Sequence, residues 1–206
     1  VIILLGSCGM IFGSIMAIMQ KELKRMVAYS SIAQMGYVFF GIGLGTPAGV
    51  ATAIFHIVGH AVTKSALFLC SGLMIEKSGS KKISDLRGIG REMPLTLILF
   101  TLGAFSMIGI PVLPGFVSKW YLSLACIEIN RLSLVIIILT SSILNVIYYF
   151  PIIINGFFGS ENLKGKIYRS KSVSKERILP VILLISAMIL VGGFSKNILS
   201  FISISF

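Results

Sequence analysis

Six apolar runs, each long enough to cross a lipid bilayer, decide what this chain can fold into. A transmembrane helix needs about 20 consecutive and mostly apolar residues, and hydrophobic residues fill 56% of the 206 positions. The runs lack the alternation of apolar and polar residues that a membrane β-barrel requires. The sequence therefore predicts an all-α fold, a polytopic membrane helix bundle. Its six transmembrane helices are expected at roughly 1–19, 27–46, 50–75, 95–127, 132–157 and 179–200.

The basic residues are distributed unevenly among the loops between these runs. The first, third and fifth loops hold 14 of the 18 lysines and arginines, whereas the second and fourth loops hold only Arg131. Short loops rich in lysine and arginine stay in the cytoplasm, so both ends of the chain are predicted on the outer side. A multi-pass protein of the bacterial inner membrane accounts for the net charge of +11, and no nucleic-acid partner is expected.

The fourth run, 95–127, is too long for one straight crossing. It has 33 residues, and its middle reads GIPVLPGFVSKW, in which Pro111 and Pro114 remove two backbone donors. We predict a broken helix with an extended segment between its halves; a simple proline kink is the alternative. Lys119 follows the break, where unwound backbone admits water and lets the lysine change its charge. Alternatively, its side chain snorkels to the outer surface.

The only two histidines of the chain lie in the third run together with a lysine. His56, His60 and Lys64 are four residues apart, so they share one helix face as a row about 12 Å long. Ionisable groups inside a membrane span face a water-filled cavity or a polar partner, and histidine titrates near neutral pH. The row is suited to passing a proton in small steps. Alternatively, each histidine bonds a neighbouring helix and only tightens the packing.

Other polar groups in the apolar runs give weaker signals. Lys24 and Arg25 lie at the predicted cytoplasmic edge of the second run, where contacts with lipid phosphates explain them. Two polar sets follow. Near the start of the second run, one polar patch consists of Tyr29, Ser30, Ser31 and Gln34. In the fifth run, a polar seam or a set of bonds between helices is expected from Asn145, Tyr148 and Tyr149.

The sequence holds no recognisable site for a cofactor. The three cysteines, Cys8, Cys70 and Cys126, lack CxxC spacing, and no glycine-rich phosphate loop or nucleophile triad is present. We therefore predict no cofactor, no bound metal, and no hydrolytic or redox chemistry in this chain alone.

Four segments, in this order, closely resemble the proton-translocating antiporter-like family. They are QKELKRMVAYSSIAQMGY, IFHIVGHAVTKSALFLCSG, LRGIGREMPLTLILFTLGAFSMIGIPVLPGFVSKW and SSILNVIYYFPII. The family includes the three large antiporter-like subunits of respiratory complex I, the A and D subunits of Mrp-type sodium/proton antiporters, and related membrane hydrogenase subunits. The sequence near Lys119 is most similar to that of Mrp D and hydrogenase-type subunits, and the similarity to the complex I subunit is nearly as high.

The resemblance implies a fold of about fourteen helices in two inverted repeats, each with a broken helix that carries a key charged residue. The six runs then look like helices nine to fourteen. Residues 1–160 form the antiporter-like core with helices nine to thirteen, and 161–206 form a basic cytoplasmic loop and the last helix.

The motif match also implies roles for individual residues. Lys119 takes the place of the key lysine or glutamate on the second broken helix. His60 and Lys64 take the place of relay residues on the helix before it, and His56 lies one turn earlier. Lys24 matches the lysine of the family's Lys-Arg pair. Protons are then expected to pass along the histidines and Lys64 to Lys119 and leave toward the outer face.

The function implied is that of a proton-translocating subunit in a multisubunit cation/proton antiporter or complex I-like pump of the NADH-quinone oxidoreductase type. Its expected partners are other membrane subunits and the lipid bilayer, and its expected ions are protons, with sodium as a second candidate. The chain begins inside an apolar run without methionine and lacks helices one to eight, so we expect a piece of something longer. The rival prediction is a truncated noncatalytic paralogue that acts only as a structural membrane subunit. A small-solute transporter is a third reading, for which the sequence shows no substrate pocket.

Overall fold

The computed structural model describes residues 1–159 and 175–204, and within these ranges every extended element of regular structure is a helix. The helices are α1 (Ile2–Ile18), α2 (Leu23–Gly43), α3 (Pro47–Ser78), the 3-10 helix η1 (Ile83–Leu86), α4 (Ile89–Glu92), α5 (Pro94–Ile108), α6 (Pro114–Glu128), α7 (Leu132–Phe158), α8 (Lys175–Gly193) and α9 (Ser195–Ser203). The predicted all-α class is therefore confirmed.

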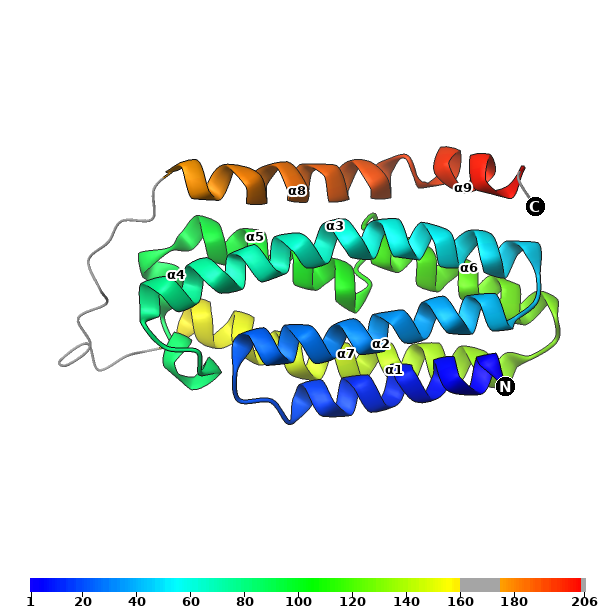
Figure 1. Cartoon of the computed structure of the whole chain (residues 1–206), viewed down its shortest axis with the longest axis horizontal. Helices are drawn as coiled ribbons and strands as arrows, with labels where there is room; N and C mark the ends of the chain where they lie inside the picture. The colour runs from blue at the N-terminus through cyan, green and yellow to red at the C-terminus, as the bar shows by residue number, and fades with distance from the viewer. Residues whose placement is uncertain (160–174, 205–206) are drawn as a thin grey trace.

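The long helices lie side by side along one axis, and the chain reverses direction at each end of the bundle (Figure 1). Both termini lie at the same end. The α1–α2 connection, η1 and α4 lie at the opposite end, where the first and third loops are joined by backbone hydrogen bonds from Leu23 N to Lys81 O and from Ile83 N to Lys21 O, both 2.9 Å. Most of the basic residues of the predicted fifth loop fall outside the described residues.

Small residues bring α1 and α2 into close contact. A Cβ added at Gly13 would lie 2.5 Å from Ala33 N, and one added at Gly36 would lie 2.5 Å from Met10 N. Glycine at helix interfaces lets two backbones approach each other in apolar surroundings, where packing and not water drives association. The pair forms one wall of the bundle.

The helix break predicted in 95–127 is present. α5 ends at Ile108. The next residue, Gly109, has a left-handed φ of 102°, and its N–H donates to Phe105 O at 3.0 Å, as expected of a glycine after a helix C-terminus. α6 begins at Pro114, in the first helical turn where proline is favoured. Between them, Val112 has a φ of 76°, so the connecting segment is not a simple proline kink.

The last apolar run differs from the single helix predicted at 179–200. α8 ends at Gly193 and α9 starts at Ser195. Two adjacent glycines, Gly192 and Gly193, weaken the helix at this point because glycine has low helix propensity. The run is therefore a long helix followed by a short one.

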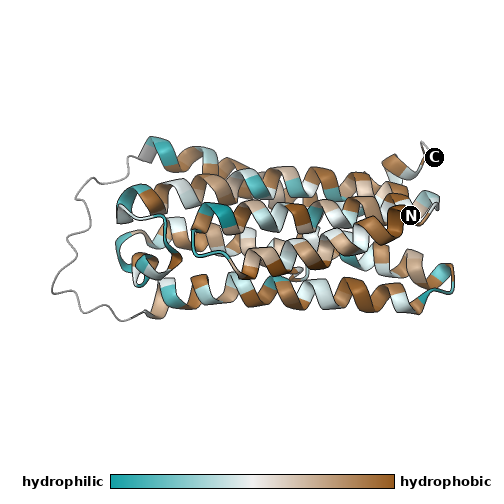
Figure 2. Ribbon diagram, turned by 60° about the horizontal axis from the view of Figure 1, so that its bottom comes forward, coloured by the Kyte–Doolittle hydropathy of each residue, from teal (hydrophilic) through white to brown (hydrophobic). Residues whose placement is uncertain are grey.

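Among residues 1–159 and 175–204, three helices have the length and apolar composition of a membrane span: α3, α7 and the Glu176–Gly193 part of α8. α1 and α5 are apolar but shorter, so the six predicted spans remain a prediction. Hydrophobic residues cover most of the helix lengths, and hydrophilic residues gather toward the loop ends (Figure 2). Large apolar side chains such as Phe12, Leu139 and Ile143 are exposed, which suits a surface that faces lipid.

Candidate functional site

Lys119 is held at the break between α5 and α6. Only 6% of the residue is exposed, and its ammonium donates hydrogen bonds to Met107 O (2.9 Å) and Ile108 O (2.8 Å). These are the last carbonyls of α5, and carbonyls at a helix C-terminus lack intrahelical partners and carry partial negative charge. The break therefore creates the binding site for the ammonium, and the side chain turns inward and does not snorkel to the surface.

Two neighbours fix the path of the Lys119 side chain. A Cβ at Gly109 would lie 3.3 Å from Lys119 Cδ, so this glycine both adopts the left-handed conformation and leaves room for the lysine. From α2, the centroid of the Tyr37 ring lies 5.1 Å from the ammonium, within the range of cation–π attraction.

Lys64 occupies a second buried site, between α2, α3 and α7. The residue is 5% exposed, and its ammonium donates to Val27 O at 2.9 Å, to the Tyr149 hydroxyl at 3.3 Å and to the Ser30 hydroxyl. The Ser30 and Tyr149 hydroxyls bond each other at 3.1 Å. Ser30 and Tyr149 belong to the two polar sets noted in the sequence, and here they do bond between helices.

The two histidines lie between the lysine sites. His56 Nδ1 is 2.7 Å from the Ser118 hydroxyl, beside Lys119 on α6. The rings of His56 and His60 are stacked with centroids 6.1 Å apart, so the shared helix face predicted for them is present. Among the residues described, His56 Nε2, His60 Nδ1 and both amide atoms of Gln34 are buried and have no hydrogen-bond partner.

Asn145 on α7 also reaches the break. Its Nδ2 donates to Met107 O at 3.0 Å, and its Oδ1 accepts from the Tyr148 hydroxyl at 2.7 Å. Met107 O therefore accepts from both Asn145 and Lys119. The sequence predicted that Asn145 lines a polar seam or bonds between helices, and the bond to Met107 O agrees with the second alternative. The contact with the break itself was not predicted.

Lys24 is not brought to this cluster. It is exposed near the start of α2, and its Nζ would lie 3.8 Å from a Cβ added at Gly72 on α3. The four other residues singled out in the sequence, His56, His60, Lys64 and Lys119, lie together along α3 and α6. No hydrogen bond or ion pair among the described residues joins Lys24 to this group, so its part in the relay stays a prediction.

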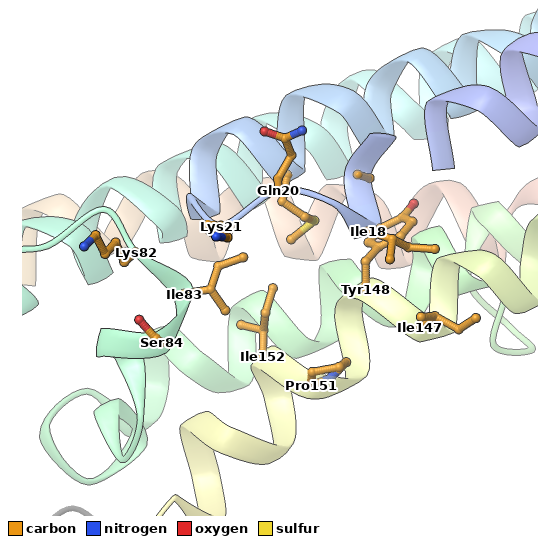
Figure 3. A pocket seen from close by; sticks show the side chains of 12 residues that line it. Ile18, Gln20, Lys21, Lys82, Ile83, Ser84, Ile147, Tyr148, Pro151 and Ile152 are labelled. Carbon is orange, nitrogen blue, oxygen red and sulfur yellow. The ribbon is translucent and has the colours of Figure 1, made fainter. Parts of the chain in front are cut away.

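A cavity of about 460 Å³ links the basic end of the bundle to α7. It extends from Gln20, Lys21 and Lys82 in the loops to Ile152 and Tyr148, the tyrosine bonded to Asn145 (Figure 3). Tyr148 is thus the point where the buried polar cluster meets a space at the end that carries the first and third loops.

The chemistry available to the cluster is proton binding. In the described part of the chain, no three His, Cys, Asp or Glu side chains lie together in a way that could hold a metal ion. All three cysteines are free. The cluster contains two lysines and two histidines, which can bind or release a proton, and several hydroxyls, which donate and accept hydrogen bonds.

Comparison with known proteins identifies the family. The model described as "NADH:quinone oxidoreductase/Mrp antiporter, TM" matches residues 1–145. NADH-quinone oxidoreductase subunit N from Desulforudis audaxviator (strain MP104C) is 35% identical in an alignment that covers 95% of this chain and 41% of the relative. This chain thus spans about two fifths of the length of that relative.

Two solved structures share the fold. The membrane-bound sulfane sulfur reductase, an archaeal respiratory membrane complex, contains a chain 30% identical to this one, with a TM-score of 0.85 over 98% of this chain and 40% of that one. The Mrp complex from Dietzia sp. DQ12-45-1b gives a TM-score of 0.86 over 98% and 45%, at 21% identity. The resemblance drawn from the four motifs is confirmed: the chain is a multi-pass membrane protein that belongs to the NADH:quinone oxidoreductase/Mrp antiporter transmembrane family.

Proposed function

We propose that this chain is the proton-translocating part of a membrane subunit, and that Lys119 is the group whose protonation is switched. The observation that carries the proposal is the chemistry around the two buried lysines. Every hydrogen-bond acceptor of Lys64 and Lys119 is neutral, and no ion pair found in the described ranges includes either residue. A buried lysine without a counter-ion is costly to keep, but it can lose its proton without stranding a carboxylate.

Two sets of polar residues lie between the lysine sites, one along α3 and one on α7, and we assign them different tasks. The histidine row, from His60 through His56 to Ser118, consists of imidazoles and a hydroxyl, which exchange protons readily. The α7 contacts run through the amide of Asn145, which donates and accepts hydrogen bonds but does not titrate. We therefore propose that the histidine row conducts protons and that α7 holds the break in place.

Internal water completes the proposed histidine path. Buried polar groups in proteins are normally hydrogen-bonded, in many cases to buried water molecules. Two of the partnerless atoms belong to the row itself, on His56 and His60, and the backbone of Gln34 lies beside His56, so we assign water binding to this position. Water there would bridge the step between Lys64 and His60, for which the side chains make no direct hydrogen bond among the contacts described.

We further propose the topology that the basic loops suggest. Six spans cross the inner membrane, with the first, third and fifth loops cytoplasmic and both ends outside. Residues 1–160 then correspond to helices nine to thirteen of a fourteen-helix fold, and 161–206 to the last loop and helix. The first and third loops lie at the end opposite both termini (Figure 1), which supports this arrangement.

The relatives support a partnership with other membrane subunits. One is a subunit of NADH-quinone oxidoreductase, and the two solved structures are a respiratory membrane complex and an Mrp complex. We propose that this chain works within an antiporter or complex I-like assembly and moves protons, with sodium as a second candidate ion. Lys24, exposed near Gly72, is then placed to face a neighbouring part of that assembly.

The test is Lys119→Ala in the assembled membrane complex, measured as formation of a pH gradient in inverted membrane vesicles. We expect transport to be abolished while the amount of assembled complex is unchanged. Lys196→Ala is the matched control because Lys196 is exposed. Unchanged proton flux in the Lys119 variant, with the complex intact, would overturn the proposal and favour a purely structural subunit.

A further inference from the structure

Pro114, the first residue of α6, packs between a glycine of α3 and a glycine of α8. A Cβ added at Gly59 of α3 would lie 2.9 Å from Pro114 Cβ. A Cβ added at Gly192 of α8 would lie 3.2 Å from Pro114 Cδ and would collide with Val112 O. The start of α6 and the segment before it therefore fit between α3 and α8 only because Gly59 and Gly192 have no side chains.

The same segment directly follows the two α5 carbonyls that bind Lys119, those of Met107 and Ile108. Gly109 N and Ile110 N both donate to Phe105 O at 3.0 Å, which ties the beginning of the connecting segment to the last turn of α5. At its other end, a Cβ at Gly115 would collide with Ser106 O, so α6 starts in direct contact with α5. A displacement of Val112 is therefore passed within a few residues to the carbonyls of Met107 and Ile108.

α8 contacts the rest of the bundle at both its beginning and its middle. At its beginning, Arg177 pairs with Glu76 of α3 through two N–O contacts of 2.6 and 2.8 Å. Farther along, Val181, Ile185 and Met188 are buried, and α8 packs against α3, α5 and α6. Gly192 lies one helical turn after Met188 on the same face and about 22 Å along the helix from Arg177.

We propose that α8 positions the break of the neighbouring helix, and that Gly192 is the positioning residue through which it holds the Lys119 site. This inference rests on the proposed function of Lys119 for its effect on transport, but its structural part does not. Gly192 faces the backbone of the connecting segment and not a flexible side chain. A side chain added at Gly192 could therefore be accommodated only by moving that backbone. α8 thus links the Glu76 end of the bundle to the geometry of the lysine site.

The experiment compares Gly192→Ala with Gly193→Ala in the assembled membrane complex. Both replacements raise helix propensity equally, but a Cβ at Gly193 would meet nothing within 4 Å. We expect Gly192→Ala to lower proton transport per assembled complex by about 10-fold or more, since a misplacement of about 1 Å can cost up to 100-fold. Gly193→Ala should transport at the wild-type rate. Equal rates in the two variants would overturn the inference.

Hydrogen–deuterium exchange gives a readout that does not depend on transport. Gly192→Ala should speed exchange in the peptide spanning 105–118, which contains the bonded amides of Gly109 and Ile110, and Gly193→Ala should not. If Lys119→Ala leaves transport unchanged, the proposed function fails, and this exchange comparison still decides whether α8 positions the break. The same exchange in both glycine variants would refute the positioning role.

Met188→Ala covers the case in which Gly192→Ala does not assemble. It loosens the buried face of α8 one turn before Gly192 without placing an atom against Val112. We expect faster exchange across 105–118 and a shift in the pH profile of transport. Among the described residues, the titratable groups that face Lys119 are His56 from α3 and Tyr37 from α2, so a moved Lys119 would change its distance to them and shift the pH profile. A variant that only reduced the amount of complex would leave the pH profile unchanged. Wild-type exchange in Met188→Ala would count against the inference.

Discussion

Replacing Lys64 with methionine is expected to separate folding from transport. Removal of the ammonium strands none of its acceptors, because the Ser30 hydroxyl still bonds Tyr149 at 3.1 Å and Val27 O at 2.9 Å. Bringing one ammonium out of water costs several kcal/mol, and three hydrogen bonds from a charged group return about 1.5–3 kcal/mol each. These terms nearly cancel, so the free energy of unfolding should stay within about 2 kcal/mol of wild type.

Lys119→Met provides the contrast. Met107 O keeps Asn145 as a donor, but Ile108 O loses the donor that Lys119 supplies. An unsatisfied buried carbonyl costs about 1–3 kcal/mol, so this variant should be less stable than Lys64→Met by that amount. The measurement is unfolding of the chain in mixed micelles by titration with SDS, paired with proton transport in vesicles.

The expected outcome is that both variants lose transport and only Lys119→Met loses stability. A Lys64→Met chain destabilised by more than about 3 kcal/mol, next to a fully stable Lys119→Met chain, would refute the reasoning. Lys64 would then be a structural tie between α2, α3 and α7, and the proposed relay would lose its first member.

Two further changes test the packing around the site. Asn145→Leu removes the α7 contact with Met107 O, and we expect a loss of about 0.6–1.7 kcal/mol in SDS unfolding, the range of interhelical hydrogen bonds in membranes; no loss would mean that α7 does not hold the break. Gly36→Ala puts a methyl group 2.5 Å from Met10 N, and we expect it to destabilise the chain by about 1–3 kcal/mol, whereas Gly45→Ala, which meets no atom within 4 Å but has a φ of 67°, isolates the cost of backbone strain.

Local features of the fold could be predicted from the sequence, because they depend on residues close to each other in the chain. The apolar runs predict helices, and Gly109, Pro111 and Pro114 predict the break. The split of the last run was missed although its glycine pair is visible in the sequence. The prediction of a single helix rested on the apolar content of the run and did not take into account the low helix propensity of two adjacent glycines.

The site was predictable only in part, because its contacts come from distant segments. Spacing placed the histidines on the right face, but it did not show that Lys64 bonds Ser30 and Tyr149 on other helices. Asn145 lies 38 residues from Met107, and nothing in the local sequence connects them. Lys24 was grouped with the relay by motif match, while its surroundings in the fold are exposed.

Pro111 explains why the ammonium of Lys119 binds where it does. In an unbroken helix, the carbonyl of Met107 would accept from the amide four residues later, but that residue is Pro111, which has no N–H. The left-handed turn at Gly109 ends the helix at that point, and Lys119 and Asn145 supply donors in place of the missing amide. A backbone amide does not lose its proton near neutral pH, whereas a lysine ammonium is a group that can release one. Under the proposed function, the break thus replaces a fixed backbone hydrogen bond of α5 with one that protonation of Lys119 can switch.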